Sequence, residues 1–307
     1  MAHAELTREI AEGPSGARIG AFFDVDRTLV AGFSVAEFIR EAIVSGRMRP
    51  AEVLDTAAAI AQFQLGRIGF SSFVAGTSIS LKGAPEAEFA EIGERVFRDR
   101  LAASVYPESR ALVQAHLKQG HSVAVVSSAT RYQIEPLARD LGIRHVLCTR
   151  LEVERGRFTG AVLKPTCYGE GKATAARGFA AAHGVDLEHS YFYTDSDEDL
   201  PLLAIVGRPR PTNPNGRLRE IAVKRGWPVR RFTSRGTLGP TEILRTSLAV
   251  GGLVPSLLLG LPAFLLDGSW RRAVNVAATV WGEIGTALAG IDVQVEGEEH
   301  LWSHRPA

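Results

Sequence analysis

The sequence predicts an α/β fold: a parallel sheet with an inserted helical region and a hydrophobic helical appendage towards the C-terminus. Three apolar runs, each ending in a polar residue, predict strands that are buried on both faces, and they cover 18–24, 122–127 and 190–195. Helical patterns precede the second and third runs, at 108–118 and 172–183. Strands that alternate with helices are typical of βαβ units, which build parallel sheets.

The composition is that of a globular chain with balanced charge. Apolar residues make up 45% of the 307 residues, and 35 Lys and Arg residues face 34 Asp and Glu residues. Because this balance gives the whole chain no strong field, we expect no nucleic-acid partner. Two cysteines, Cys148 and Cys167, are too few for a disulfide framework, and the first residues contain no apolar signal segment. These features predict a cytoplasmic protein.

Residues 31–110 interrupt the alternation of strands and helices. Apolar residues recur there at spacings of three and four, which predicts a series of helices. The helical patterns cover 35–44, 51–65, 71–81 and 86–103. We therefore expect a helical subdomain inserted into the α/β core. A small hairpin around Gly156 is predicted further along, over 153–162.

Each expected strand ends at residues that can take part in chemistry. Asp24 and Asp26 follow the first strand, Ser127 ends the second, and an acidic run, 195–199, begins at the end of the third. These residues should lie together, because parallel sheets bind ligands at the carboxyl ends of their strands. Converging carboxylates repel each other unless a cation joins them, and oxygen ligands suit Mg²⁺. One Asp can act as a nucleophile, and a second Asp two residues later can supply or take a proton.

In this order and spacing, the motifs resemble those of the haloacid dehalogenase superfamily of phosphatases, in its phosphoserine-phosphatase-like branch. Residues 24–28 read Asp-Val-Asp-Arg-Thr and match the first motif, DxDxT, and Ser127 matches the second. Lys172 matches the third motif, and 195–199, Asp-Ser-Asp-Glu-Asp, match the acidic fourth. The resemblance covers roughly 18–232. It implies a Rossmann-like sheet core.

The resemblance also implies a role for each matched residue. Asp24 would be the nucleophile and Asp26 the general acid and base. Mg²⁺ would be bound by the carboxylates of Asp24 and Asp195 and by the backbone carbonyl of Asp26. Ser127 and Lys172 would hold the phosphoryl oxygens. The implied activity is hydrolysis of a phosphomonoester through an aspartyl-phosphate intermediate.

One carboxylate and the insert complete the implied domain. Asp199 would support the site from outside the metal's own ligands or serve as an additional ligand. The insert 31–110 stands where this branch carries its helical cap, so we expect a phosphatase core over 18–232 with the cap inserted. The remaining segment, 233–307, would be a separate hydrophobic appendage.

The cap departs from the phosphoserine phosphatase pattern at two positions that would contact the substrate. Phe33 stands where that pattern has a Glu for the substrate ammonium, and aligning the stretch 81–85 puts Thr77 where it has an Arg for the substrate carboxylate. An ammonium without a partner would be costly to bury beside Phe33. We therefore expect a small or lipid-like alcohol phosphate as the substrate. Phosphoserine is the alternative, with Arg67 in place of the missing Arg.

The C-terminal segment 233–307 includes a long stretch without charge. Residues 246–266 carry no charged side chain, and a helix of that length spans roughly 31 Å, about one hydrocarbon core. Pro255 and Pro262 interrupt it, which suits a re-entrant hairpin or an interfacial helix pair as well as a span. We expect this segment to associate with a membrane surface. The alternative is a buried hydrophobic helix of a soluble protein.

The end of the chain carries a second resemblance. Residues 281–307 are similar to the lead-in of a glycerolipid (1-acylglycerol-3-phosphate) acyltransferase domain, which some bacterial proteins fuse behind a phosphatase of this branch. The catalytic HxxxxD pattern of that domain is absent from the sequence. We therefore do not expect acyl transfer by this chain alone. A further alternative for the whole chain is a non-catalytic, membrane-anchoring or regulatory half of such a fusion.

Overall fold

A computed structural model describes residues 2–45 and 67–233, together with 55, 56, 58, 59, 62, 63, 275, 279 and 282. The chain divides into two units, residues 1–235 and 236–307, and all elements below belong to the first. The predicted membrane-associating segment, 246–266, lies outside the described residues, as does the chain after residue 282. Where the chain is described, no helix has both the length and the apolar character needed to cross a membrane.

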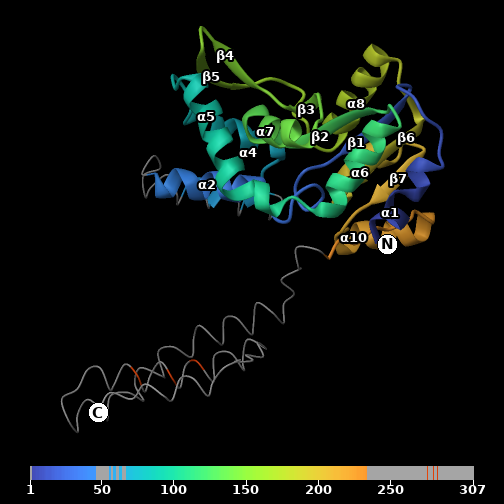
Figure 1. The fold of residues 1–307 in the computed structure, drawn as a ribbon. Helices are drawn as coiled ribbons and strands as arrows, with labels where there is room; N and C mark the ends of the chain where they lie inside the picture. The colour runs from blue at the N-terminus through green and yellow to red at the C-terminus, as the bar shows by residue number, and fades with distance from the viewer. Residues whose placement is uncertain are drawn as a thin grey trace, which may run out of the picture. The chain divides into compact units, whose positions relative to one another are not determined.

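Five parallel strands form the central sheet, in the order β3-β2-β1-β6-β7 (Figure 1). Their bounds are β1 (Ile19–Phe23), β2 (Ser122–Thr130), β3 (His145–Thr149), β6 (Asp186–Thr194) and β7 (Arg208–Pro211). The predicted parallel α/β fold is confirmed. Phe23 of β1 lies opposite Val125 on one side and Tyr193 on the other. The loop after β1 therefore opens at the middle of the carboxyl edge of the sheet.

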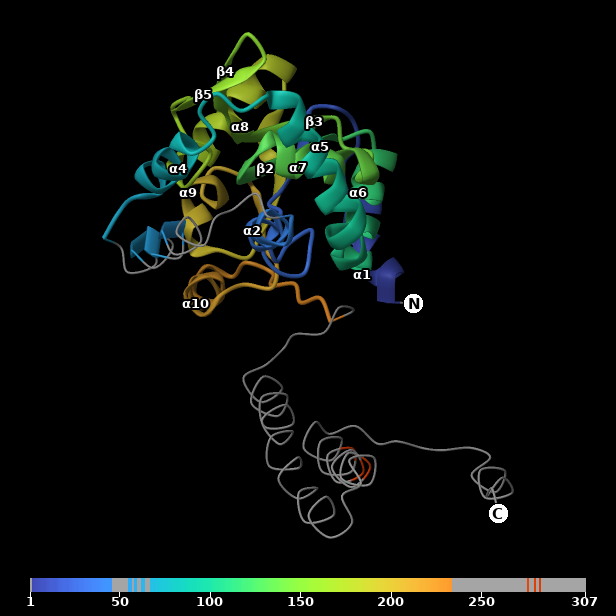
Figure 2. The same cartoon turned by 90° about the vertical axis from the view of Figure 1, so that its left-hand side faces the viewer.

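Helices cover both faces of this sheet (Figure 2). One face packs against α1 (Ala2–Ala11), α6 (Pro107–Lys118) and α7 (Arg131–Leu141), and the other against α8 (Glu170–His183), α9 (Leu200–Leu203) and α10 (Gly216–Arg225). Phe22 packs with Phe179 of α8, whereas Phe23 joins the cluster that contains Leu112 of α6. Because successive residues of a strand point to opposite faces, β1 is apolar at every position.

The inserted region between β1 and β2 is helical where it is described. It contains α2 (Ser34–Val44), α4 (Phe70–Ile79), α5 (Glu86–Val96), a π-helical turn η1 (Phe97–Leu101) and a short 3₁₀ turn η2 (Ala102–Ser104). Phe38 of α2 packs with Val96 and Leu101 in a buried cluster. The helix predicted over 86–103 is thus α-helical only to Val96. The helix predicted over 51–65 lies mostly outside the described residues.

The predicted hairpin is present and is attached to the inserted region. Strands β4 (Leu151–Glu154) and β5 (Arg157–Val162) pair antiparallel. The two turn residues, 155–156, have φ values of 49° and 73°, the positive values that a type I′ turn requires. The backbone of Phe158 exchanges two hydrogen bonds, of 2.8 and 3.0 Å, with the segment 83–84 before α5. The hairpin therefore supports the inserted helices from the side of the core.

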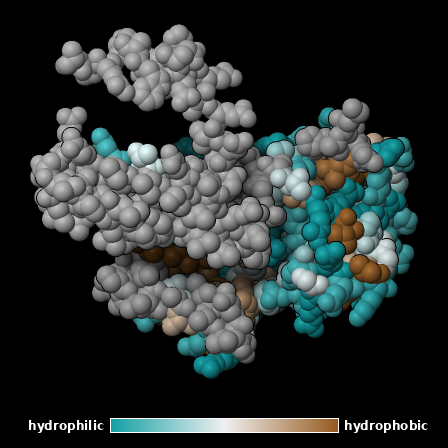
Figure 3. Space-filling model, turned by 90° about the horizontal axis from the view of Figure 1, so that it is seen from below, coloured by the Kyte–Doolittle hydropathy of each residue, from teal (hydrophilic) through white to brown (hydrophobic). Residues whose placement is uncertain are grey.

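The surface of the first unit is mostly hydrophilic in the described part of the face drawn in Figure 3, and its hydrophobic side chains stand there in separate small groups. Larger hydrophobic side chains are exposed at the start and end of α2, namely Phe33, Val35, Ile43 and Val44. Isolated apolar residues on a surface are normal, so their exposure alone does not indicate a binding site.

Candidate active site

The sheet brings the ends of β1 and β6 together. Asp24 follows the last residue of β1, and its backbone N–H donates to the carbonyl of Tyr193 over 2.9 Å. Asp195 follows β6 directly. Both carboxylates are buried, at 7% exposure each. Neighbouring parallel strands that end at the same edge therefore place two acidic residues side by side, as the sequence predicts.

Lys172 joins two carboxylates that are far apart in the sequence. Its Nζ lies 2.8 Å from Asp24 Oδ1 and 2.8 Å from Asp199 Oδ2. Asp199 Oδ2 also accepts a hydrogen bond of 2.6 Å from the hydroxyl of Thr194. Lys172 belongs to the first turn of α8, and a Cβ on Gly171 would come within 1.8 Å of a backbone carbonyl. Glycine before the lysine therefore lets the first turn of α8 pack directly against the backbone of Thr166.

Arg27 holds the carboxylate of Asp195. Its Nη1 lies 3.3 Å from Asp195 Oδ2, and the Arg27 side chain is 40% exposed. The backbone carbonyl of Asp195 accepts from the N–H of Asn215 over 2.8 Å. Arg27 has a φ of 57°, in the left-handed region that non-glycine residues seldom occupy. Backbone strain of this kind clusters at functional sites, which agrees with the position of Arg27 between Asp26 and the acidic loop.

Asp26 points to the inserted region instead of to Lys172. Its Oδ1 accepts a hydrogen bond of 2.7 Å from the backbone N–H of Ser34, the first residue of α2. Burial raises the pKa of Asp26, and hydrogen bonds from the backbone and the side chain of Ser34 lower it in part. The buried hydroxyl of Thr28, nearby in the sequence, has no hydrogen-bond partner within the described part of the chain.

The site contains four carboxylates, which are those of Asp24, Asp26, Asp195 and Asp199. Together they carry more negative charge than their cationic partners neutralise. Within the described ranges, the cationic side chains ion-paired to these carboxylates are Lys172 and Arg27. Burial raises the pKa of Asp24 to about 8, even though Lys172 acts in the opposite direction. Burial likewise raises the pKa of Asp195 to about 7, against the effect of Arg27. Burial would lower the pKa of Lys172, but the adjoining carboxylates raise it, so this ammonium stays charged.

Ser127 lies on the strand next to Asp24. It is 2% exposed, two residues beyond Val125, which pairs with the last residue of β1. Its hydroxyl accepts a hydrogen bond of 3.2 Å from the N–H of Ala129. The structure thus places Ser127 at the same edge of the sheet as the carboxylates, while its role in holding phosphate stays a prediction.

The three cap residues predicted to contact the substrate have different surroundings. Phe33 is 57% exposed and directly precedes Ser34, the residue bonded to Asp26. The hydroxyl of Thr77 donates to backbone carbonyls of its own helix over 3.0 and 3.2 Å. Arg67 is exposed, and its backbone N–H donates to the carbonyl of Gln62. In the described ranges, no hydrogen bond or ion pair joins Arg67 or Thr77 to the carboxylates.

Sequence reasoning missed Tyr168, which joins the inserted helix α4 to the loop before Lys172. The rings of Tyr168 and Phe70 of α4 stack with centroids 4.4 Å apart and 9° between their planes. The Tyr168 hydroxyl bonds to Glu198 of the acidic loop, and this contact, together with burial, raises its pKa. Next to this stack, the hydroxyl of Ser71, the residue after Phe70, lies 2.8 Å from that of Thr166, two residues before Tyr168. An aromatic residue four positions before the motif lysine is the only sequence signal for this contact.

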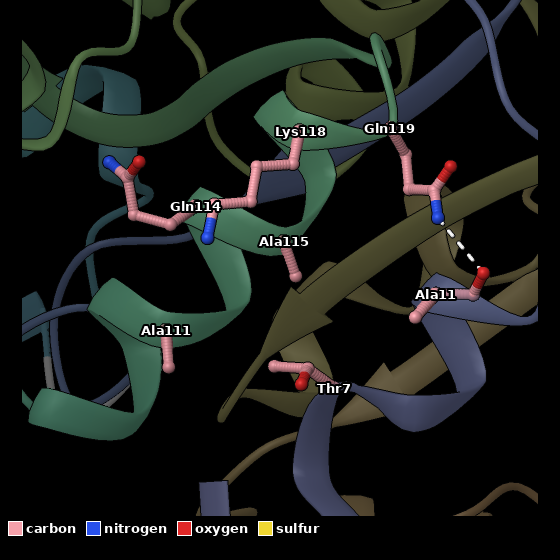
Figure 4. A pocket seen from close by; sticks show the side chains of 7 residues that line it. All are labelled: Thr7, Ala11, Ala111, Gln114, Ala115, Lys118 and Gln119. Atoms are coloured by element: carbon pink, nitrogen blue, oxygen red, sulfur yellow. Dashed lines mark hydrogen bonds between the residues drawn. The ribbon is translucent and has the colours of Figure 1, made fainter. Parts of the chain in front are cut away.

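A cavity of about 430 Å³ lies elsewhere, between α1 and α6 (Figure 4). Its lining residues are Thr7, Ala11, Ala111, Gln114, Ala115, Lys118 and Gln119. The side-chain amide of Gln119 donates to the carbonyl of Ala11 across it, over 2.9 Å. None of these residues belongs to the loops that carry the carboxylates, so this cavity takes no part in the site.

Comparison with known proteins agrees with the site. Residues 21–204 match the family model of haloacid dehalogenase-like hydrolases. A probable phosphatase of Mycobacterium tuberculosis is 37% identical over 227 residues, which are 71% of this chain and 76% of that protein. A phosphoserine phosphatase of the same organism is 36% identical over 69% of this chain and 70% of its own length. A histidinol-phosphatase of Neisseria meningitidis is 31% identical over 69% of this chain and 98% of its own length.

Solved structures show the same architecture. A protein of unknown function from Bordetella pertussis superposes with a TM-score of 0.66 at 31% identity, over 70% of this chain and 98% of that one. The matched family region, 21–204, includes β1, the inserted helices, Lys172 and the acidic loop. With more than half of the chain matched, this protein belongs to the haloacid dehalogenase-like hydrolases, a family of enzymes.

Proposed function

We propose that this chain is a Mg²⁺-dependent phosphomonoester hydrolase that acts through an aspartyl phosphate on Asp24. The observation that carries the proposal is the contact of Lys172 Nζ with both Asp24 and Asp199, at 2.8 Å each, inside a buried group of carboxylates. A lysine held against the nucleophile can neutralise the charge of a phosphoryl group there. The names of the relatives, as phosphatases, support the same activity.

In the proposed reaction, a carboxylate oxygen of Asp24 attacks phosphorus, and the bond from phosphorus to the leaving-group oxygen breaks. Asp26 gives its proton to that oxygen, so that a neutral alcohol leaves. Water then attacks the phosphorus of the aspartyl phosphate, and Asp26 takes up the water proton. Inorganic phosphate leaves and the Asp24 carboxylate is restored. Ser127 and Lys172 would hold the phosphoryl oxygens in both steps.

The residues at the site fit Mg²⁺. The carboxylates of Asp24 and Asp195 and the backbone carbonyl of Asp26 supply oxygen ligands, which this cation prefers. The raised pKa values of both carboxylates, to about 8 and about 7, support a need for further positive charge. Among the described residues, no three His, Cys, Asp or Glu side chains cluster closely enough to hold a metal. Water and substrate oxygens would complete the coordination, and the bound ion would neutralise phosphoryl charge.

We propose a small or lipid-like alcohol phosphate as the substrate. Asp26 must reach the leaving-group oxygen, so the carbon skeleton of the leaving group would begin near Asp26. Phe33 precedes the residue bonded to Asp26 and is 57% exposed, which offers an apolar surface there. Thr77 satisfies its hydroxyl within α4 and brings no charge for an amino-acid substrate.

Phosphoserine is the second candidate substrate. A relative 36% identical to this chain is named a phosphoserine phosphatase, and a relative named histidinol-phosphatase adds another amino alcohol phosphate. The exposed Arg67 is the side chain that would bind the substrate carboxylate in this case. The substitution Arg67→Ala would then raise KM for phosphoserine while sparing an uncharged alcohol phosphate.

A candidate from another class is a non-catalytic module that anchors or regulates an acyltransferase of lipid metabolism. The charge-free segment 246–266 and the similarity of 281–307 to an acyltransferase lead-in support it. The intact pair of Asp24 and Asp26, with Lys172 against Asp24, favours the enzyme. We propose a cytoplasmic enzyme that meets the membrane surface through 246–266.

The deciding experiment is hydrolysis of a panel of phosphates by the full chain, with Mg²⁺ and with a chelator. The panel contains p-nitrophenyl phosphate, glycerol phosphate, a lysophosphatidate, phosphoserine and histidinol phosphate. We expect turnover only with Mg²⁺, and a higher kcat/KM for glycerol phosphate or lysophosphatidate than for phosphoserine. Full activity in chelator would overturn the metal assignment, and phosphoserine as the best substrate would overturn the substrate assignment. No turnover of any member would favour the non-catalytic module.

A further inference from the structure

Helix α2 begins at the carboxylate of Asp26. The N–H groups in the first turn of a helix have no partner within the helix, and a side-chain oxygen commonly accepts from one of them. Phe33, the residue before α2, has no side chain that can do this. Asp26 Oδ1 instead accepts from the N–H of Ser34, over 2.7 Å. The carboxylate of Asp26 is therefore the cap of a helix that starts eight residues later.

Beyond its first residue, helix α2 is tied to the other inserted helices. Phe38 is buried with Val96 and Leu101. On the same helix, Glu41 pairs with Arg100 and Arg95 over 3.5 and 3.7 Å. These contacts join α2 to α5 and η1 on both its buried and its charged side. The hydrogen bond of Ser34 thus connects the cap with the proposed acid of the core.

We infer that Ser34, through its backbone N–H, is a positioning residue for Asp26. Proton delivery to the leaving group then depends on the position of helix α2 and the rest of the cap relative to the core. This inference rests on the proposed function of Asp26. The N–H holds Oδ1, which limits the rotation of the carboxyl group and so restricts the position of Oδ2. Small errors in the position of a catalytic group are expensive in rate. Because this contact is made by a backbone N–H, it cannot be predicted from a side-chain motif in the sequence.

The substitution Ser34→Pro removes the N–H at a position where proline fits. Ser34 is the first residue of α2, the helical position that proline favours. Phe33 has φ −116° and ψ 119°, the extended conformation that a residue before proline adopts. The Ser34 hydroxyl also hydrogen-bonds to the Asp26 carboxyl and is lost in this variant, so its loss needs a control of its own. Ser34→Ala is the matched control, because it also loses the hydroxyl but keeps the N–H.

The readout is kcat/KM for two substrates that differ in their need for a proton. This constant covers the steps up to phosphorylation of Asp24 and excludes the later attack of water. Glycerol phosphate has a poor leaving group that needs an acid, whereas p-nitrophenyl phosphate has a good one that does not. We expect S34P to lose about 10- to 100-fold relative to S34A on glycerol phosphate, within the range for general acid catalysis. On p-nitrophenyl phosphate we expect a loss of less than about 3-fold.

Equal losses on both substrates, or no loss on either, would overturn the inference. Failure of the proposed function is separate, since the unsubstituted chain would then hydrolyse neither substrate. If thermal unfolding shows that S34P does not fold, the same comparison is made with the amide of residue 34 replaced by an ester. That ester removes the N–H with little change of shape, and the α-hydroxy acid analogue of serine introduces it. A substrate-selective loss in the ester supports the inference, and an unselective result overturns it.

Discussion

At the scale of single residues, Asp24 is a buried carboxylate at the end of the central strand of the sheet. Its carboxylate has one recorded ionic partner in the described part of the chain, Lys172, and burial raises its pKa to about 8. A buried acid of this kind is costly to keep unless its chemistry is needed. The neighbouring Asp199 shares Lys172 with Asp24 but also accepts a hydrogen bond from Thr194.

The first prediction concerns the nucleophile. Asp24→Asn should lower turnover of p-nitrophenyl phosphate by at least about a thousand-fold, because an amide cannot form the aspartyl phosphate. The fold should persist, since the amide oxygen can still accept from Lys172. Stopped turnover with an unchanged circular dichroism spectrum is the expected result. Asp140→Asn, at the surface ion pair with Arg110, is the control and should keep its activity. Residual activity within ten-fold of the unsubstituted chain, roughly 1.4 kcal/mol, would remove Asp24 from the mechanism.

The sequence allowed side-chain patterns at the site to be predicted, but not the backbone contacts. Asp24, Ser127, Lys172 and the acidic loop were found from the ends of apolar runs, because strand ends gather at one edge of a parallel sheet. The structure brings Asp24, Lys172 and Asp199 into contact, while their chemical roles stay predictions. Ser34 acts through an N–H that every residue but proline has, so its identity carries no signal.

At the scale of elements, strands β1, β2 and β6 were predicted because they are apolar on both faces. Strand β7, Arg208–Pro211, was missed, since it reads Arg-Pro-Arg-Pro and proline cannot donate to a sheet. It is tolerated at the sheet edge, where Arg210 pairs with Glu9 of α1 and lies over the ring of Tyr191. Such a burial of arginine depends on partners about 200 residues away in sequence, which no local pattern contains.

The second prediction concerns the contact of α4 with the loop before Lys172. Phe70→Ala removes the ring that stacks on Tyr168 at 4.4 Å. Such pairs contribute about 0.5–1.5 kcal/mol. We therefore expect KM for p-nitrophenyl phosphate to rise about 2- to 10-fold, because the cap loses a contact that holds it in place. Ile79→Ala is the control on the same helix, because Ile79 is 66% exposed. If the two variants have the same KM, the stack does not hold the cap in its substrate-binding position.

The third prediction concerns a buried pair of histidines between α6 and the sheet. His121 Nε2 lies 2.9 Å from the carbonyl of Pro14, which can only accept, so His121 carries its proton there. Its Nδ1 then accepts from His116 Nδ1 over 2.7 Å, and His116 Nε2 accepts from the Tyr193 hydroxyl over 2.9 Å. Both rings are therefore neutral. Burial lowers the pKa of each below the ordinary value of 6.5.

This arrangement makes stability depend on pH in one direction. Below pH 6.5 the two histidines bind protons in the unfolded chain but stay neutral in the folded one. Their contribution to the free energy of unfolding is therefore fully present above that pH and is lost as the pH drops. We expect Tm to fall between about pH 7.5 and about pH 5.5, and the double variant H116Q/H121Q to show a flatter slope. His189→Gln, at an exposed histidine, should keep the original slope. An equal slope in the double variant would show that other groups control acid stability.

At the scale of the whole molecule, catalysis and membrane association are assigned to different parts of the chain. The family match ends at residue 204, and the first unit ends at residue 235. The four carboxylates, Lys172 and the described inserted helices all belong to that unit. The predicted limits of the core, 18–232, and of the appendage, 233–307, stay predictions. The charge-free segment 246–266 belongs to the second unit.

The fourth prediction follows from this division. A chain that ends at Arg235 should stay in solution and keep its turnover of p-nitrophenyl phosphate, because the catalytic groups belong to the first unit. The full chain should sediment with vesicles that contain anionic lipid. Basic residues flank 246–266, and burying half of that segment would contribute several kcal/mol at about 25 cal/mol per Å². If instead the full chain stays in solution beside the vesicles and the shortened chain aggregates, 246–266 covers apolar surface of the protein itself.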